Sequence, residues 1–171
     1  MKLGIISDTH DRVDNIIKMV NILNQHQVKL VIHCGDWVAP FTLQYYQPLK
    51  CPLRGVFGNN DGDKFRHLRL SQTKKFKVDV EYEDTFLELE IDKRKLAVYH
   101  GDYASITHAL VTCGEYDAVF HGHTHVKVNQ TVGKVLSLNP GTLLPQTSPT
   151  VKGASFAIYD TATNSAEIIR L

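Results

Sequence analysis

Three histidines stand close together in this sequence, in the segment His121-Gly-His-Thr-His125. Imidazole is the commonest metal ligand among protein side chains, so this cluster indicates a metal centre. The apolar run at 116–120 precedes it and predicts a buried strand that ends where the histidines begin. Because functional side chains concentrate in loops that a rigid element positions, we expect chemistry at this strand end.

Four other apolar runs end in the same way, in Asp, His or Asn beside a small or polar residue. They end at Asp8-Thr-His10, Gly35-Asp36, Gly58-Asn-Asn-Asp61 and His100-Gly-Asp102. The strand ends together supply oxygen and nitrogen donors without a thiolate, namely Asp8, His10, Asp36, Asn59, His100, His123 and His125. Such a set suits two divalent metal ions that share one carboxylate. Imidazole mixed with carboxylate favours Mn, Fe, Ni, Co or Zn over a Mg-only or Ca-only oxygen cage, and we take Mn as the first choice, with Mg retained as an alternative.

The charge of such a centre indicates its chemistry. Two divalent cations outweigh the carboxylates of Asp8 and Asp36, so the centre stays positive even with a bridging hydroxide. A positive pair of metals binds phosphoryl oxygens, lowers the pKa of a bridging water and stabilises an in-line displacement. The residues therefore predict hydrolysis of phosphate esters.

The first half of the chain predicts the elements that position these residues. Apolar runs at 2–7, 30–33 and 53–57 predict strands, and helical spacing at 13–23 predicts a helix with Asp11 or Asp14 as its N-cap. A short helix is expected at 40–46. Strands joined by helices run parallel, so their carboxyl ends meet at one sheet edge, which is where ligands bind in open parallel sheets.

The second half predicts further strands and a helix. Strands are expected at 85–91, at 95–99 after a turn that holds Arg94, and at 116–120, with a helix at 106–111 and hairpins at 126–132/135–138 and 156–159/166–169. The sequence predicts at least nine strands but only about three helices, and this is more β-sheet than a simple doubly wound domain contains. The pattern predicts an α/β fold of two packed sheets flanked by helices.

Two charge runs lie between these halves. Basic residues at 64–77 lack an acidic neighbour, and acidic residues at 79–92 lack a basic one. The simple interpretation is two solvated faces. The alternative places the basic run, as a loop beside the site, in contact with an anionic substrate through Arg66.

Length and composition limit the class of protein. With 171 residues the chain fits one domain, 1–171. A net charge of +1 and a pI near 7.8 argue against a dedicated nucleic-acid surface. Three scattered cysteines, no signal segment and no apolar run of membrane length predict a cytoplasmic protein. Assembly into a homo-oligomer is left open.

The motifs resemble, in order and along nearly the whole chain, those of the calcineurin-like metallophosphoesterases. They are Asp8-x-His10, Gly35-Asp36, Gly58-Asn59, His100 and Gly122-His-x-His125. The small size, the early first motif and Asn139-Pro-Gly141 are most similar to the short phosphodiesterase branch that also includes the eukaryotic retromer subunit.

The resemblance implies a four-layer αββα sandwich of two mixed sheets. It implies one metal on Asp8, His10 and His125, a second on Asn59, His100 and His123, and Asp36 as the bridge. It also implies hydrolysis by a metal-activated hydroxide without a covalent intermediate. The substrate would be a small phosphodiester or nucleotide-type molecule.

One position departs from the family pattern. The motif that contains Asn59 most often continues with a histidine that steadies the transition state or protonates the leaving group, and here that residue is Asn60. We assign Asp36, Asn60 and Asp61 to the catalytic centre, with Asn60 also contacting substrate and Asp61 the first alternative proton donor.

Alternatives remain for function and for other residues. A protein-binding scaffold on the same fold, a phosphomonoesterase and a nucleotide pyrophosphatase compete with the phosphodiesterase assignment, because loops set substrate choice. His33 is expected in the core or behind a ligand, His121 as a packing residue or the orienter of a ligand, and Asp102 behind the ligands. His26, His67 and His108 are expected on the surface, and Cys34 is expected to be buried and inert.

Overall fold

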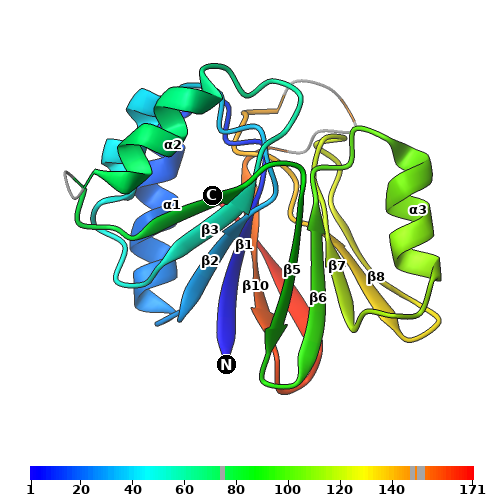
Figure 1. Cartoon of the computed structure of the whole chain (residues 1–171). Helices are drawn as coiled ribbons and strands as arrows, with labels where there is room; N and C mark the ends of the chain where they lie inside the picture. The colour runs from blue at the N-terminus through cyan, green and yellow to red at the C-terminus, as the bar shows by residue number, and fades with distance from the viewer. Residues whose placement is uncertain (74–75, 147–148, 150–152) are drawn as a thin grey trace.

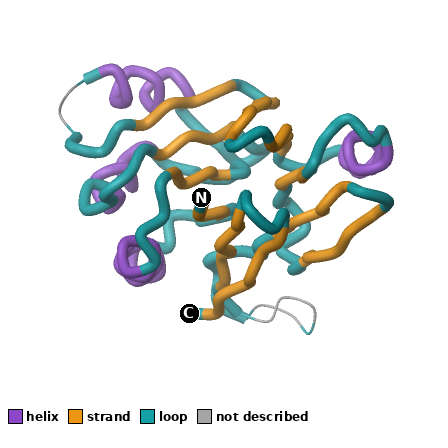
Figure 2. The backbone as a smooth tube through the Cα atoms, turned by 90° about the horizontal axis from the view of Figure 1, so that it is seen from below, coloured by secondary structure: helices purple, strands orange, loops and turns teal. Residues whose placement is uncertain are grey.

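The computed structural model describes residues 1–73, 76–146, 149 and 153–171. Two β-sheets pack face to face, with helices on the outer face of each (Figure 1). Viewed along the strands, the tube shows these helix, sheet, sheet and helix layers side by side (Figure 2). The predicted four-layer αββα sandwich is confirmed.

The first sheet has the strand order β11-β10-β1-β2-β3-β4. Its parallel strands are β1 (Lys2–Ile6), β2 (Leu30–His33), β3 (Leu53–Val56) and β4 (Val80–Glu83). The hairpin of β10 (Ser155–Asp160) and β11 (Ser165–Arg170) adds antiparallel to β1. The first strand of the chain is therefore central, paired with strands from both ends of the sequence.

The second sheet has the order β5-β6-β7-β9-β8. Its parallel strands are β6 (Arg94–Tyr99), β7 (Ala118–Phe120) and β9 (Val135–Asn139), with β5 (Phe86–Ile91) and β8 (Val128–Val132) antiparallel at its edges. The prediction that Arg94 lies in the turn was wrong, because Arg94 is the first residue of β6. Both sheets are mixed, as expected.

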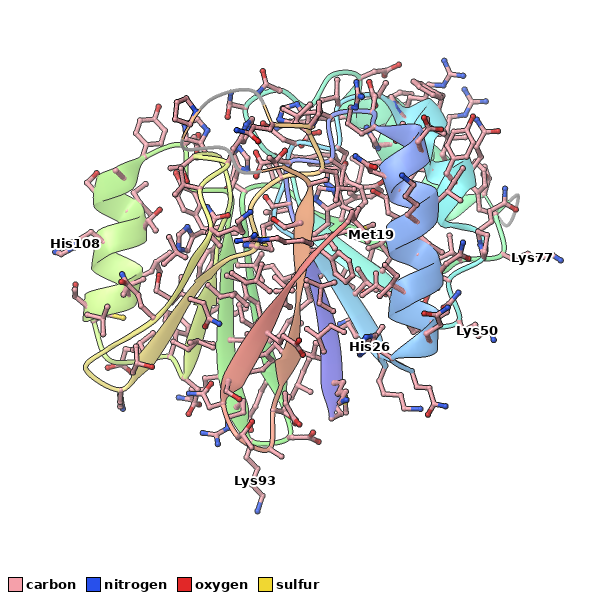
Figure 3. All side chains as sticks on the ribbon, turned by 180° about the vertical axis from the view of Figure 1, so that it is seen from behind. Met19, His26, Lys50, Lys77, Lys93 and His108 are labelled. Atoms are coloured by element: carbon pink, nitrogen blue, oxygen red, sulfur yellow. The ribbon has the colours of Figure 1, made fainter. Side chains whose placement is uncertain are left out.

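Three apolar layers hold the sandwich together. Between the sheets, side chains such as Leu3, Val98 and Phe120 are buried. Outside the first sheet, α1 (Val13–Gln25) buries Ile16, Met19, Val20 and Leu23, and Met19 points inward from this helix (Figure 3). Outside the second sheet, α3 (Ala104–Thr112) packs through Val111, while His108 points away from the protein.

Two local predictions were wrong. The N-cap of α1 is Arg12, without a side-chain cap, and Asp11 instead accepts a hydrogen bond from the Ala39 N–H at 3.0 Å.

The basic run is not a loop, because residues 64–72 form α2 (Lys64–Gln72). This helix is capped by Asp63, whose side chain accepts from the Arg66 N–H. Lys74 and Lys75 lie outside the described residues. The short helix at 40–46 is a 3₁₀ helix, η1 (Pro40–Tyr46).

The site lies at one end of both sheets. The loops that follow β1, β2, β3, β6 and β7 gather at the top of Figure 1, whereas Lys93, in the β5–β6 turn, lies at the opposite end (Figure 3). Among the described residues, no helix is long and apolar enough to cross a membrane.

Candidate metal centre

Asp36 lies between two groups of the predicted ligands. In the first group, one donor atom from each of Asp8, His10, Asp36 and His125 lies within 4.8 Å of the others. His125 Nε2 lies 3.2 Å from Asp8 Oδ1, and His10 Nε2 lies 3.6 Å from Asp36 Oδ2. This arrangement can hold one divalent cation.

The second group lies on the other side of Asp36. His100 Nε2 is 3.4 Å from Asp36 Oδ1 and 3.0 Å from Asn59 Oδ1. His123 Nδ1 is 2.9 Å from the same Asn59 oxygen. The fold thus brings all seven predicted ligands together, with Asp36 turned toward both groups.

The hydrogen bonds of Asp8 fit a metal ligand. Its Oδ2 accepts from Ser7 Oγ at 2.6 Å and from the His123 N–H at 3.0 Å. Its Oδ1 is buried and faces the ring nitrogens of His125 at 3.2 Å and of His10 at 3.8 Å. Because a buried carboxylate oxygen needs a positive partner and both rings are of a metal-ligand type, this atom is well placed to hold a cation.

His100 fits a metal ligand through its other ring nitrogen. Nδ1 lies 2.8 Å from the Cys34 carbonyl, which can only accept, so in the neutral ring Nε2 carries the lone pair that faces the site. Burial lowers the pKa of His100, but the hydrogen bond to Asp36 and the charges of Asp8 and Asp36 outweigh it and raise the pKa to about 9. Without a cation, this position therefore attracts a proton.

Three further pKa shifts arise from burial and from hydrogen bonds within the centre. Burial raises the pKa of Asp36, but hydrogen bonds from His100 and Asn60 outweigh burial and hold it well below its usual value. The hydrogen bond to Asp8 raises the pKa of His125, whereas burial lowers that of His10. The centre keeps the Asp36 carboxylate charged, as cation binding requires.

The backbone of the candidate metal centre is strained. Five of the seven predicted ligands have a positive φ, namely Asp8, His10, Asp36, His123 and His125. Residues other than glycine rarely adopt this conformation, which costs about 1–3 kcal/mol each and is concentrated at functional sites. The strain turns side chains at the strand ends toward a common point.

Two glycines allow the loops to approach one another. A Cβ on Gly122 would lie 1.8 Å from Ser7 Oγ and 2.5 Å from Asp8 Oδ2. A Cβ on Gly58 would lie 2.3 Å from Asp36 Oδ1. Any side chain at these positions would occupy the space of the centre.

Asn60 and Asp61 both contact the loop of Asp36. Asn60 donates to Asp36 from its backbone N–H at 2.9 Å and from Nδ2 at 2.8 Å. Asp61 accepts from the backbone N–H groups of Asp36, Val38 and Gly58. Burial raises the pKa of Asp61 despite these donors. The geometry supports a positioning role for Asp61, and its role as a proton donor stays a prediction.

A basic side chain other than Arg66 lines a cavity beside the centre. Arg66 is exposed on α2, and its predicted contact with substrate stays untested. Lys64 instead lines a cavity with Asn59 and Asp61. The ammonium of Lys64 lies 3.3 Å from Asp84 and 5.2 Å from the centre of the Phe57 ring.

The remaining histidines lie away from the ligand set. His33 is buried, stacks on Trp37 and lies 3.1 Å from Thr9 Oγ1. His121 Nε2 lies 3.0 Å from Ser137 Oγ, so its described partner is not a ligand. His108 is exposed and His26 is partly exposed, as expected, and Cys34 is buried with a pKa that burial raises.

The surface prediction for His67 was wrong. This side chain is fully buried, and its Nδ1 lies 3.0 Å from the Tyr82 hydroxyl. Its ring contacts Phe57 and Tyr82. Tyr82 belongs to β4, a strand that the acidic run concealed, so no local pattern indicates this contact.

Three residues that support the centre were missed. Ser7 donates to Asp8, as described above, and Thr142 Oγ1 donates to the Asp8 carbonyl at 2.7 Å. Asn139 Nδ2 donates to the Gly122 carbonyl at 2.8 Å and to Thr124 Oγ1 at 3.1 Å. We had assigned the Asn139-Pro-Gly141 motif no role at the centre, although its asparagine fixes the histidine loop.

Known proteins share this sequence pattern and fold. Residues 1–164 match the calcineurin-like phosphoesterase superfamily domain. Phosphodiesterase MJ0936 of Methanocaldococcus jannaschii is 39% identical over 144 residues, which cover 82% of this chain and 83% of that protein. The solved structure of an archaeal phosphodiesterase superposes with a TM-score of 0.88 at 34% identity, covering 100% of both chains.

A more distant likeness shows the fold alone. Vps29 of Entamoeba histolytica, solved in complex with Zn²⁺, superposes with a TM-score of 0.66 at 18% identity and covers 100% of this chain and 98% of its own. The predicted family and branch are confirmed. This chain belongs to the calcineurin-like phosphoesterase superfamily.

Proposed function

We propose that this protein is a metal-dependent phosphodiesterase with two divalent ions per chain. The observation that carries the proposal is the complete set of seven donors, with three on each side of Asp36. The relatives described as phosphodiesterases support the same reaction class. Because both sheets supply ligands, we treat residues 1–171 as one domain.

The residues divide into two ligand sets. One ion would be held by Asp8, His10 and His125. The other ion would be held by Asn59, His100 and His123. Asp36 would bind both ions. When bound, the ions supply Lewis acidity and lower the pKa of water between them. Manganese is our first choice, because imidazole and carboxylate ligands are mixed and no thiolate is present among the donors.

The chain itself orients this set and contacts the substrate. Asn60 fixes Asp36 through two hydrogen bonds, and the Cys34 carbonyl fixes His100. Asn60 is exposed beside the centre, where its amide can contact a phosphoryl oxygen. An amide cannot donate a proton to a departing alkoxide, so we expect good leaving groups to be preferred.

The test combines metal content with turnover. The purified protein should bind close to two equivalents of Mn²⁺ and hydrolyse bis(p-nitrophenyl) phosphate faster than p-nitrophenyl phosphate. Metal binding without any turnover would support the scaffold alternative instead. Preferred hydrolysis of the monoester would support a phosphomonoesterase.

We also propose a reducing compartment, most simply the cytoplasm. All three cysteines are free, and Cys34 is buried beside the centre. Free thiols of this kind are typical of reducing compartments. Quantitative thiol labelling of the unfolded protein, isolated from cells under alkylating conditions, should recover all three.

A further inference from the structure

A cavity of about 420 Å³ adjoins the candidate metal centre. One wall comes from the loop after β3 and the start of α2, with Asn59 and Lys64. The opposite wall comes from the end of β6 and the start of α3, with Tyr99, Tyr103 and Ile106. The volume lies within the range of about 300–1,000 Å³ that is typical of small-ligand sites.

Asn59 connects this cavity to the reacting centre. The side-chain oxygen of Asn59 is within 3.0 Å of His100 Nε2 and 2.9 Å of His123 Nδ1. A second cavity of about 410 Å³ lies beside α3, but none of the seven candidate ligands lines it. A substrate whose phosphate is at the centre can therefore extend past Asn59 into the first cavity.

The charges of this cavity argue against a second phosphate. Among the described residues that line it, Lys64 supplies the one ammonium, and Asp61 and Asp102 supply two carboxylates. Lys64 is also 3.3 Å from Asp84. The surroundings are thus neutral to negative, which suits an uncharged group and disfavours a pyrophosphate or a polyphosphate.

The far wall presents an aromatic ring. Tyr103 is 64% exposed and Ile106 is 44% exposed, although both are large apolar side chains at the start of α3. Tyr103 is held through its backbone, since its N–H donates to the Tyr99 hydroxyl at 3.1 Å and its carbonyl accepts from Ile106 at 3.0 Å. The ring therefore stands on a fixed backbone and is free to stack on a ligand.

We propose that this cavity binds an uncharged planar aromatic group esterified to the substrate phosphate, stacked on Tyr103. This inference rests on the proposed phosphodiesterase function and names its substrate class as an aryl or nucleoside phosphodiester. The ring can come from a nucleobase or from a simple aryl group. Both offer a flat π-face, and stacking on an aromatic side chain does not depend on the base.

The experiment compares three monoesters as competitive inhibitors of bis(p-nitrophenyl) phosphate hydrolysis. AMP carries a base, phenyl phosphate carries an aryl ring, and ribose 5-phosphate carries neither. Tyr103→Ala should weaken inhibition by AMP, by phenyl phosphate or by both about tenfold, the scale of one stacking contact. Inhibition by ribose 5-phosphate should stay unchanged, and calorimetric titration of the Mn²⁺-loaded protein should repeat the pattern.

The controls separate stacking from other effects. Tyr103→Phe keeps the ring and should bind like the wild type, and Phe65→Ala removes an aromatic side chain that is 75% exposed on α2 outside the cavity. Loss confined to AMP identifies a base, and loss confined to phenyl phosphate identifies an aryl group. Equal inhibition of wild type and Tyr103→Ala by all three monoesters overturns the inference while turnover persists. Absence of turnover in the wild type would instead overturn the proposed function.

Discussion

Histidines lie in two neighbouring regions of this protein, and their surroundings differ. At the open edge, the rings of His10, His100 and His125 face the carboxylates of Asp8 and Asp36. Behind that edge, His33 and His67 lie in an aromatic wall with Trp37, Phe57 and Tyr82.

The pKa of histidine shifts differently in the two regions. Burial lowers the pKa of His33 and His67, so the wall keeps them neutral. At the metal centre, hydrogen bonds to carboxylates raise the pKa of His100 and His125, whereas burial still lowers that of His10. The comparison teaches that the partner of the ring nitrogen, rather than burial alone, determines whether a buried histidine attracts a cation.

The largest expected effect separates the two regions directly. Asp36→Asn should lower kcat by at least about 10³-fold and reduce bound Mn²⁺, because one neutral amide replaces the carboxylate that faces both ligand groups. His33→Gln should lower the melting temperature but keep the metal. Metal analysis and turnover of both purified variants check this. Full metal content and turnover in Asp36→Asn would refute the shared role of this carboxylate.

The next effect tests how the edge is supported. Asn139→Ala removes the hydrogen bonds to Gly122 and Thr124 and should weaken Mn²⁺ binding about 10- to 100-fold, as loss of a group that orients ligands does. Asn129→Ala is a matched control, because Asn129 donates to the Ala166 carbonyl at 2.7 Å and no described hydrogen bond joins Asn129 to a predicted ligand. Competition with a fluorescent chelator measures the Mn²⁺ affinity of both variants. Equal affinities would show that the histidine loop holds its shape without Asn139.

A smaller effect concerns the proton donor that the edge lacks. Asn60→His should speed hydrolysis of alkyl phosphodiesters about tenfold and leave aryl esters nearly unchanged, because general acid catalysis matters most for poor leaving groups. The measurement is the slope of log kcat against leaving-group pKa, at saturating Mn²⁺. A wild-type slope near zero, with chemistry limiting, would mean that another acid already serves, and Asp61 would be tested first.

The smallest effect on activity is expected in the wall, where the readout is stability. The folded pKa of His67 is below its unfolded value, so its contribution is fully present above the unfolded pKa near 6.5 and is lost as pH falls. His67→Gln should remove up to about 1.4 kcal/mol per pH unit from the acid slope of the unfolding free energy. Urea unfolding at pH 7 and pH 5 gives this slope. An unchanged slope would show that His67 is not protonated on unfolding.

Much of the fold followed from apolar periodicity. The strand at 30–33 and the short helix at 40–46 were predicted with their observed bounds, because short runs ended at strong polar or proline signals. The strands at 85–91 and 95–99, which are β5 and β6, and both hairpins were also predicted. The gathering of Asp8, Asp36 and Asn59 followed from the rule that parallel strands share their carboxyl edge, whereas His100 follows a strand of the second sheet and was placed with them by the family resemblance.

The rest depended on contacts that a sequence does not display. β4 was missed because Glu81 and Glu83 flank its buried positions, and Glu81 is paired with Arg54 at 2.6 Å. α2 was missed because its charged residues conceal a single buried side chain, His67. The support of Asp8 by Thr142 joins residues 134 positions apart, and no local pattern reports such a pair.

The central place of β1 has a consequence for how the protein is made. Ile5 pairs with Ala157 on β10, so one side of the first strand has no partner until the ribosome has added about 150 more residues. At roughly 5–20 residues per second this takes about 8 to 30 s. During that time an apolar strand edge is open to other nascent chains, which is the condition that favours aggregation. Slower initiation or chaperone supply during expression should therefore raise the soluble yield more than any change at the metal centre.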